Sequence, residues 1–277
     1  YSFVSPRGVD KINLPADDEK RNFVKIMNPL GEETSVMRTT LIPNMLDVIS
    51  TNISHKVEEV SAFECGNTFI PQEGLPIETK KYCVGMYGKE VDFFVLKGVI
   101  ESVLNNVGLK GYEIEPETTN LTFHPGRCAK IVYNNIYIGT FGELHPNVIE
   151  NYNLGQRVYV AEINIDTVFE NLNLTKSYNP LPKYPSTSRD IALIVKDEVF
   201  VKQIEDIIKA NGEDLVESYK LFDVYKGAQI EEGHKSIAYS ITYRSKDKTL
   251  TDEDVAKVHE KILSELSEKL NANLRSN

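Results

Sequence analysis

The sequence predicts an α+β protein that is built from two domains. Its 277 residues exceed the roughly 100–200 that one domain usually takes. Pro180, Pro182 and Pro185 lie in a Ser- and Thr-containing stretch where neither a helix nor a strand ladder can continue. Segments with strand periodicity and segments with helical periodicity occur on both sides of this stretch. We therefore expect a first domain at residues 1–175, a linker at 176–182 and a second domain at 183–277.

The first recognisable elements of the first domain are a helix and two strands. Residues 37–55 carry apolar side chains with a period of about 3.6, and Pro43 fits such a helix only in its first turn. The segments Val60–Ile70 and 80–88 have the residue composition that is typical of strands.

A second helix and further strands are expected after these. Residues 94–107 predict a helix that Gly108 ends. Asn134-Asn135 can adopt the positive φ values of a tight hairpin turn, so the runs on either side of it should pair antiparallel. Residues 157–169 predict one more strand. Together these elements predict an antiparallel sheet with flanking helices.

The second domain opens with a strand and a helix. Residues 189–195 contain a continuous apolar run that is typical of a buried strand. Residues 200–210 repeat apolar side chains at helical spacing and end at Asn211-Gly212. Residues 215–225 and 236–244 then alternate with period two around a glycine-containing loop, which predicts two strands.

The last part of the second domain predicts a helix and a short strand. Thr251 and Asp254 have the spacing of a capping box. The helix that follows carries one apolar stripe, made by Val255, Val258, Ile262, Leu266 and Leu270. Residues 271–275 predict a final strand. The resulting order β-α-β-β-α-β is the ferredoxin-like pattern.

Composition and charge exclude several classes of protein. With 31 basic and 41 acidic side chains the net charge is −10, so any contact with nucleic acid should be local and we expect no DNA partner. Apolar runs such as 191–195 are far shorter than the roughly 18 residues that cross a bilayer, so we expect no membrane partner. The scattered Cys65, Cys83 and Cys128 favour a reduced, cytoplasmic location. The start at Tyr1, without a methionine, suggests a piece of a longer polypeptide.

Two histidine motifs are candidates for chemistry, although their surroundings favour structural roles. His124 and Cys128 have a spacing that would form a thiolate–imidazole pair on a helix, but Pro125-Gly126 prevents that helix. His145 precedes Pro146, a pair that is typical of the turn before a helix.

The sequence does not favour a phosphate or metal site. It contains neither G-x-G-x-x-G after a strand nor G-x-x-x-x-G-K-[ST]. Asp17-Asp18-Glu19 and Glu231-Glu232 could hold a hard cation, but charge runs among loop residues are usually solvated. We therefore predict that this chain binds no metal and no cofactor.

The most suggestive feature is the pair of strands around the glycine-containing loop of the second domain. Four residues spaced by two should share one face of the first strand: Tyr219, Leu221, Asp223 and Tyr225. Asp223 could accept hydrogen bonds from the N–H groups of a base while Tyr225 stacks on it, and Ser236 could add a polar contact. The alternative is a Tyr-rich edge strand with a solvated carboxylate, and these residues alone leave both interpretations open.

Seven segments resemble, in sequence and in order, the C-terminal portion of the beta subunit in the bacterial-type phenylalanyl-tRNA synthetase family. They are NPLGEETSVMRTTLIPNMLDVISTNISH, AFECGNTFIP, FVLKGVIESVL, FHPGRCAKI, IGTFGELHP, YPSTSRDIALIV and LFDVYKGAQIEEGHKSIAYSITYRSKDKTLTDEDV. Agreement in seven separated motifs across nearly the whole chain is more specific than a shared fold.

The resemblance implies that residues 1–175 form a class II synthetase-like domain that is non-catalytic. Class II sites hold the ATP phosphate with an arginine in an F-R-x-E strand, whereas Phe63-Glu64 lacks it. A G-x-G-x-x-R-like element is also missing from IGTFGELHP. In the family the alpha subunit carries catalysis, for which ATP and magnesium are expected, and this domain packs against it in an (αβ)2 heterotetramer. We therefore expect no catalytic residue here.

The resemblance also implies a ferredoxin-fold anticodon-binding domain at residues 183–277. In the family the residues at the positions of Asp223, Tyr225, Ser236 and Arg275 contact the first anticodon base of tRNA(Phe). The Asp and Ser form hydrogen bonds and the Tyr stacks. The implied function is ATP-dependent attachment of phenylalanine to tRNA, to which this part would contribute anticodon binding.

Two other functions are alternatives at this point. Amino-acid-sensing regulatory proteins with ACT-like domains share the β-α-β-β-α-β order and bind amino acids at sheet edges. A self-sufficient enzyme would use His124 and Cys128.

Overall fold

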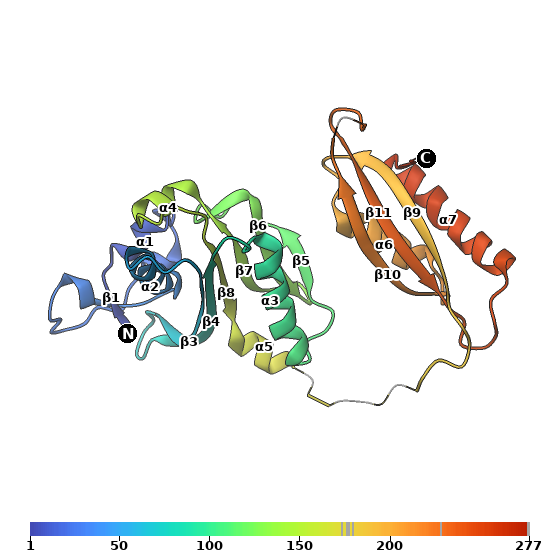
Figure 1. Cartoon of the computed structure of the whole chain (residues 1–277). Helices are drawn as coiled ribbons and strands as arrows, with labels where there is room; N and C mark the ends of the chain where they lie inside the picture. The colour runs from blue at the N-terminus through green and yellow to red at the C-terminus, as the bar shows by residue number, and fades with distance from the viewer. Residues whose placement is uncertain (173, 176–177, 179, 228, 276–277) are drawn as a thin grey trace. The chain divides into compact units, whose positions relative to one another are not determined.

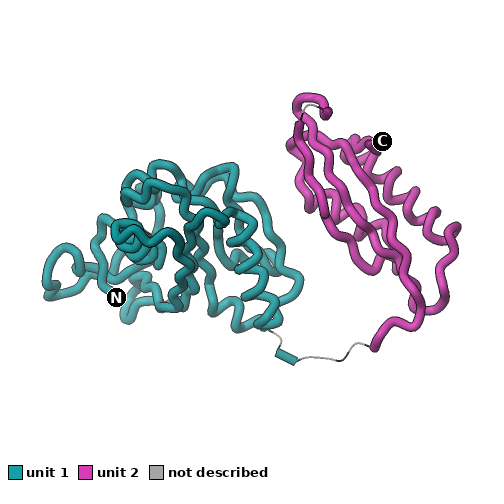
Figure 2. The backbone as a smooth tube through the Cα atoms, in the orientation of Figure 1, with its two compact units in different colours: residues 1–176 teal, residues 177–277 magenta. Residues whose placement is uncertain are grey.

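The computed structural model describes residues 1–172, 174–175, 178, 180–227 and 229–275. The chain divides into two compact units, Tyr1–Lys176 and Ser177–Asn277, which Figure 2 shows in different colours. The division falls in the stretch that precedes Pro180, Pro182 and Pro185.

The first unit is built around a six-stranded sheet whose neighbouring strands are all antiparallel (Figure 1). The strand order is β3-β4-β8-β7-β6-β5. The strands are β3 (Val60–Ile70), β4 (Ile77–Tyr87), β5 (Glu113–Pro116), β6 (Phe123–Tyr133), β7 (Ile136–Leu144) and β8 (Tyr159–Asn164). Asn134 and Asn135, with φ of 49° and 63°, form the turn between β6 and β7, which confirms the predicted hairpin.

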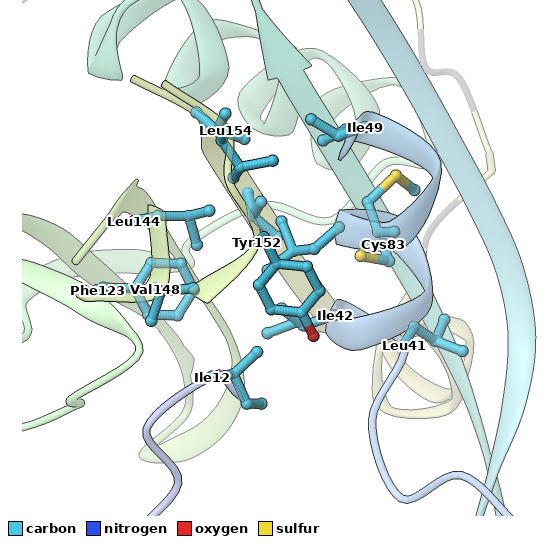
Figure 3. Packing of buried hydrophobic residues seen from close by; sticks show 14 of the residues in the cluster. Ile12, Leu41, Ile42, Ile49, Cys83, Phe123, Leu144, Val148, Tyr152 and Leu154 are labelled. Carbon is cyan, nitrogen blue, oxygen red and sulfur yellow. The ribbon is translucent and has the colours of Figure 1, made fainter. Parts of the chain in front are cut away.

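Helices cover both faces of this sheet. They are α1 (Gly8–Lys11), α2 (Ile42–Ser54), α3 (Phe93–Asn106), α4 (Pro146–Asn151) and α5 (Ile165–Asn171). One hydrophobic core joins α2 to Cys83 of β4 and to Tyr152 after α4, as Figure 3 shows. A second core, on the other side, joins α3 and α5 to Val84 and Phe141. Because Cys83 and its neighbour Val84 lie in different cores, the sheet is buried on both faces.

Close packing of α2 on the sheet depends on a glycine. A Cβ at Gly85 of β4 would lie 2.6 Å from Cγ of Met45 and 2.7 Å from Cδ1 of Ile49. Such distances are too short for carbon atoms, so this position favours glycine. Pro43 lies in the first turn of α2, as its sequence position predicts.

The structure differs from the sequence prediction at residues 157–169. The strand β8 ends at Asn164, and Ile165–Asn171 form the helix α5. Asn164 caps this helix, because its side-chain Oδ1 accepts a hydrogen bond from the backbone N–H of Thr167 at 3.5 Å. The capping residue is the signal that could have separated the two elements.

Several short elements of the first unit carry too little periodicity to be predicted. Strands β1 (Phe3–Val4) and β2 (Val36–Met37) pair antiparallel, and single 3-10 turns occupy Glu19–Arg21 and Glu32–Thr34. Strand β5 is also short and lies at the edge of the large sheet.

The second unit has the predicted ferredoxin-like order. Its elements are β9 (Thr187–Lys196), α6 (Val201–Asn211), β10 (Val216–Tyr225), β11 (His234–Tyr243), α7 (Asp252–Leu270) and β12 (Asn273–Leu274). The sheet order is β10-β11-β9-β12, with antiparallel neighbours throughout. Thr251 Oγ1 accepts from the N–H of Asp254 at 3.2 Å, and the carboxylate of Asp254 accepts from the N–H of Thr251 at 3.1 Å, which confirms the capping box.

Both helices of the second unit pack on one face of its sheet (Figure 1). Ile191, Leu193 and Val195 of β9 and the odd-numbered residues 237–243 of β11 form the core with them. We call the opposite side of this sheet the open face. It carries Ala192 and Ile194 of β9, Ser236 and Ala238 of β11, and Asn273 of β12.

None of the helices in the described part of the chain is both long and apolar enough to cross a membrane.

Candidate nucleic-acid interface

A β-bulge in β10 divides the four residues that the sequence predicts on one face. Leu221 pairs with Tyr239 of the core, but the register then shifts and Asp223 pairs with Ala238 of the open face. The bulge inserts one residue and therefore reverses the alternation of side chains beyond it. The prediction of one shared face is wrong: Tyr219 and Leu221 pack toward the core, whereas Asp223 and Tyr225 lie on the open face.

The bulge brings Tyr225 onto the same face as Ser236. These two residues pair directly between β10 and β11. Ser236 in turn pairs with Ile194 of β9, which pairs with Asn273 of β12 on its other side. Paired residues share a face, so these four residues form one row across the open face.

A second row, next to the first, contains the other two predicted site residues. The backbone N–H of Arg275 donates to the carbonyl of Ala192 at 2.9 Å, Ala192 pairs with Ala238, and Ala238 pairs with Asp223. Arg275 and Asp223 therefore lie at opposite ends of this row. The two alanines between them have the smallest side chains of any residue except glycine. The centre of the row therefore carries no large side chain.

The side chain of Arg275 extends over the open face to Tyr225. Its Cζ atom lies 5.5 Å from the centroid of the tyrosine ring, which is the geometry of a cation–π contact. Its Nη2 atom donates to Oε1 of Gln229, in the loop between β10 and β11, at 3.0 Å. Tyr225 is 37% exposed, whereas Ser236 below it is only 4% exposed. The structure thus places Asp223, Tyr225, Ser236 and Arg275 on one face and brings the side chains of Arg275 and Tyr225 into contact.

This arrangement suits recognition of a planar base that carries N–H donors. The carboxylate of Asp223 is exposed and can accept hydrogen bonds, and the ring of Tyr225 can stack on a base. The Arg275 guanidinium supplies donors for an acceptor edge or a phosphate. Gln229 also belongs to this site, through its hydrogen bond to Arg275, but the sequence does not predict it as a site residue. A polar residue in a loop carries no periodic signal.

The histidine and cysteine motif of the first unit does not form a nucleophilic site. His124 and Cys128 lie in strand β6, and Nδ1 of His124 accepts from the backbone N–H of Gly126 at 3.0 Å. Burial raises the pKa of the Cys128 thiol to about 12, which disfavours the thiolate. The second histidine motif has the predicted structural role, since Nδ1 of His145 caps α4 by accepting from the N–H of Asn147 at 3.2 Å.

The arginine nearest to the Phe63-Glu64 strand is engaged within the fold. Nη1 of Arg38 donates to Oε1 of Glu64 at 2.6 Å, and its Nε donates to the carbonyl of Asn67 at 3.0 Å. The Arg38 side chain is 5% exposed. This guanidinium therefore neutralises a carboxylate of the sheet and is turned away from solvent.

The described residues contain no group of three or more His, Cys, Asp or Glu side chains that could hold a metal ion. In the first acidic cluster, Oδ1 of Asp18 caps a 3-10 turn by accepting from the N–H of Lys20 at 2.8 Å.

Two family models match the chain. The model described as "Phenylalanyl tRNA synthetase beta chain CLM domain" matches residues 1–165, and the one described as "Ferredoxin-fold anticodon binding domain" matches residues 182–275. The chain belongs to the phenylalanyl-tRNA synthetase beta-chain family. The open face described above therefore lies in the part that matches the anticodon-binding domain of this family.

Curated relatives agree with this family. The chain is 47% identical to the phenylalanine–tRNA ligase beta subunit of Clostridium tetani over 99% of its length, and 47% identical to that of Clostridium acetobutylicum. It is 37% identical to the beta subunit of Symbiobacterium thermophilum. These relatives are ligase subunits, and the chain spans 35% of the first two and 32% of the third. The matches give no support to the ACT-type sensor that the sequence left as an alternative.

Proposed function

We propose that this chain is the C-terminal part of a phenylalanine–tRNA ligase beta subunit and that its second domain, residues 183–277, reads the first anticodon base of tRNA(Phe). Asp223 and Ser236 would hydrogen-bond the edge of the base, Tyr225 would stack on it and Arg275 would donate from the other side. The observation that carries this proposal is the placement of these four residues on two adjacent rows of the open face.

The charge of the second domain supports local base reading. After Leu181 the sequence has 15 Lys and Arg against 18 Asp and Glu. Such a domain can neutralise few phosphates, so its affinity for RNA should be modest and should depend weakly on salt. Specificity would then come from the base contacts.

The first domain, residues 1–175, would support a catalytic alpha subunit. Its surface exposes large apolar side chains in β1 and in the segment between the two 3-10 turns: Phe3 is 49%, Met27 92% and Leu30 101% exposed. Phe3 and Leu30 line a hollow of about 520 Å³ together with Ile26 and Pro29. Exposed apolar surface that surrounds a hollow is typical of a protein–protein contact. We propose that the alpha subunit binds here.

Catalysis, with ATP and magnesium, is assigned in this proposal to other parts of an (αβ)2 heterotetramer that works in the cytoplasm. The described side chains of this chain do not form a cluster that would fit magnesium, and Arg38 is paired with Glu64. No chemical step of the reaction is assigned to this chain. Its contribution would be to bind the alpha subunit and to recognise tRNA.

The test is co-expression of the full-length beta subunit with its alpha subunit. We expect a complex with the mass of an (αβ)2 assembly that charges tRNA(Phe) in the presence of ATP, magnesium and phenylalanine. Charging should fall when the first anticodon base is replaced. Equal kcat/KM for the native and the replaced base would contradict anticodon reading by this enzyme.

The alpha-subunit surface is tested separately by two matched variants. Leu30→Asp places a charge in the proposed contact and should abolish co-purification of the alpha subunit. Leu75, which is 84% exposed in the turn between β3 and β4, provides the control, and Leu75→Asp should leave the complex intact. If both variants retain the alpha subunit, the contact lies elsewhere.

A further inference from the structure

The loop between β10 and β11 contacts both members of the Arg275–Tyr225 pair. Gln229 of this loop accepts the hydrogen bond from Nη2 of Arg275 at 3.0 Å. Gly227 of the same loop lies so close to Tyr225 that a Cβ on it would be 2.6 Å from the phenol oxygen. Gly227 therefore lies against the hydroxyl end of the ring, and Gln229 holds the guanidinium over its face.

The position of the Arg275 guanidinium is not fixed by the sheet itself. The sheet register determines only the backbone of Arg275, through its N–H bond to Ala192. The Arg275 side chain has several rotatable bonds, and the residue comes directly after β12, a strand of only two residues. Among the described residues, its far end contacts the ring of Tyr225 and the side-chain oxygen of Gln229.

We propose that Gln229 is a positioning residue of the nucleotide site, which acts by holding the guanidinium of Arg275 over Tyr225 before RNA arrives. This inference rests on the proposed function, because it concerns the same four-residue site. The ligand is an RNA nucleotide whose base stacks on the ring of Tyr225 and whose acceptor groups accept hydrogen bonds from Arg275. A guanidinium that is already in place loses less conformational entropy on binding than a free one.

The test uses the complete alpha–beta enzyme with variants of the full-length beta subunit. Gln229→Met keeps the length of the side chain and removes the acceptor oxygen, so it should raise KM for tRNA(Phe) by about 3- to 10-fold with kcat unchanged, the effect of one net hydrogen bond. Gln229→Ala should act alike. Glu232→Ala, at an exposed residue of the same loop, is the matched control and should leave KM unchanged.

A double-mutant cycle distinguishes a positioning role from a direct contact or a purely structural role. If Gln229 acts through Arg275, then Gln229→Met should have little effect in an Arg275→Ala background. Additive effects would overturn the proposal, and so would a wild-type KM for Gln229→Met. Tighter tRNA binding by Gln229→Met would also overturn it, because that result would indicate that Gln229 hinders Arg275.

Tyr225→Ala separates failure of this inference from failure of the proposed function. If Tyr225→Ala and Arg275→Ala raise KM but Gln229→Met does not, the site stands and the role of Gln229 is wrong. If none of these variants changes KM, the anticodon site itself is wrong, and the inference falls with it.

Discussion

Thr40 donates its hydroxyl hydrogen to Oε1 of Glu162 at 2.7 Å, although 121 residues separate the two in the chain. The same oxygen accepts from the backbone N–H of Leu41, also at 2.7 Å. Leu41 is the N-cap residue of α2, whose own side chain cannot cap a helix. A carboxylate of β8 therefore supplies the missing cap and ties α2 to the sheet.

Replacement of Glu162 should destabilise the first unit. Glu162→Ala leaves the Leu41 N–H and the Thr40 hydroxyl without their acceptor, so we expect a loss of about 1–3 kcal/mol in the free energy of unfolding. Glu162→Gln keeps an acceptor oxygen and should cost less. Urea denaturation measures the loss, with exposed Glu150→Ala in α4 as the control. Equal stability of Glu162→Ala and Glu150→Ala would show that this cap contributes nothing.

Removal of the Tyr225 ring should weaken tRNA recognition. Tyr225→Ala should cost roughly 1–3 kcal/mol in kcat/KM for charging, the range for loss of an aromatic stacking partner of a single-stranded base. Tyr225→Phe should cost little, because the ring remains. The assay uses the assembled alpha–beta enzyme and tRNA(Phe). An equal loss in Tyr225→Phe would assign the effect to the hydroxyl group and contradict stacking.

Asp223 should affect the choice of base. Asp223→Ala removes an acceptor that only a base with N–H donors at that edge can use, so discrimination between guanine and other first bases should decrease. The measurement is the ratio of kcat/KM for tRNA with the native and with the replaced first base. Asp223→Asn, which keeps one acceptor oxygen, should retain part of the discrimination. A uniform decrease for all bases would instead indicate a general binding role.

The cysteines should differ strongly in reactivity. Cys65 is exposed, whereas Cys83 and Cys128 are buried. Burial raises the pKa of the Cys128 thiol to about 12 and that of Cys83 well above its ordinary value. At pH 8 we expect one thiol of the native chain to react quickly with a disulfide reagent, and all three after unfolding. Cys65→Ser should abolish the fast phase, and a fast phase that persists would contradict this assignment.

His259 should make the second unit less stable at acidic pH. Burial, and then the nearby Arg189, lower the pKa of His259 below its ordinary value of 6.5, and its Nδ1 lies 2.9 Å from the hydroxyl of Tyr243. The unfolded chain then binds a proton that the native state does not. Stability should therefore be complete above pH 6.5 and decrease as the pH falls through 6.5 toward the lower, folded-state pKa.

The histidine effect is measured by comparing urea denaturation of the native chain and of His259→Gln between pH 5 and pH 8. The difference in unfolding free energy between the two proteins should change with pH, because glutamine does not titrate in this range. A pH-independent difference would contradict the linkage.

Family membership and the ferredoxin-like order could be predicted from local sequence. The apolar stripe from Val255 to Leu266 and the cap at Thr251 depend on residues a few positions apart, whose spacing is the same in any fold. The segment 157–169 is less predictable from its sequence, because a strand that runs directly into the helix α5 leaves one capping residue, Asn164, as the boundary.

The sequence by itself determined which residue types are available: a carboxylate at 223, a phenol at 225, a hydroxyl at 236 and a guanidinium at 275. Only the tertiary structure decided which of them face the same way. The bulge after Leu221 reverses the side-chain alternation of β10, and the cross-strand register sets Tyr225 opposite Ser236. Alternation along one strand is a local property, whereas a bulge and a register depend on the partner strand, which lies elsewhere in the sequence.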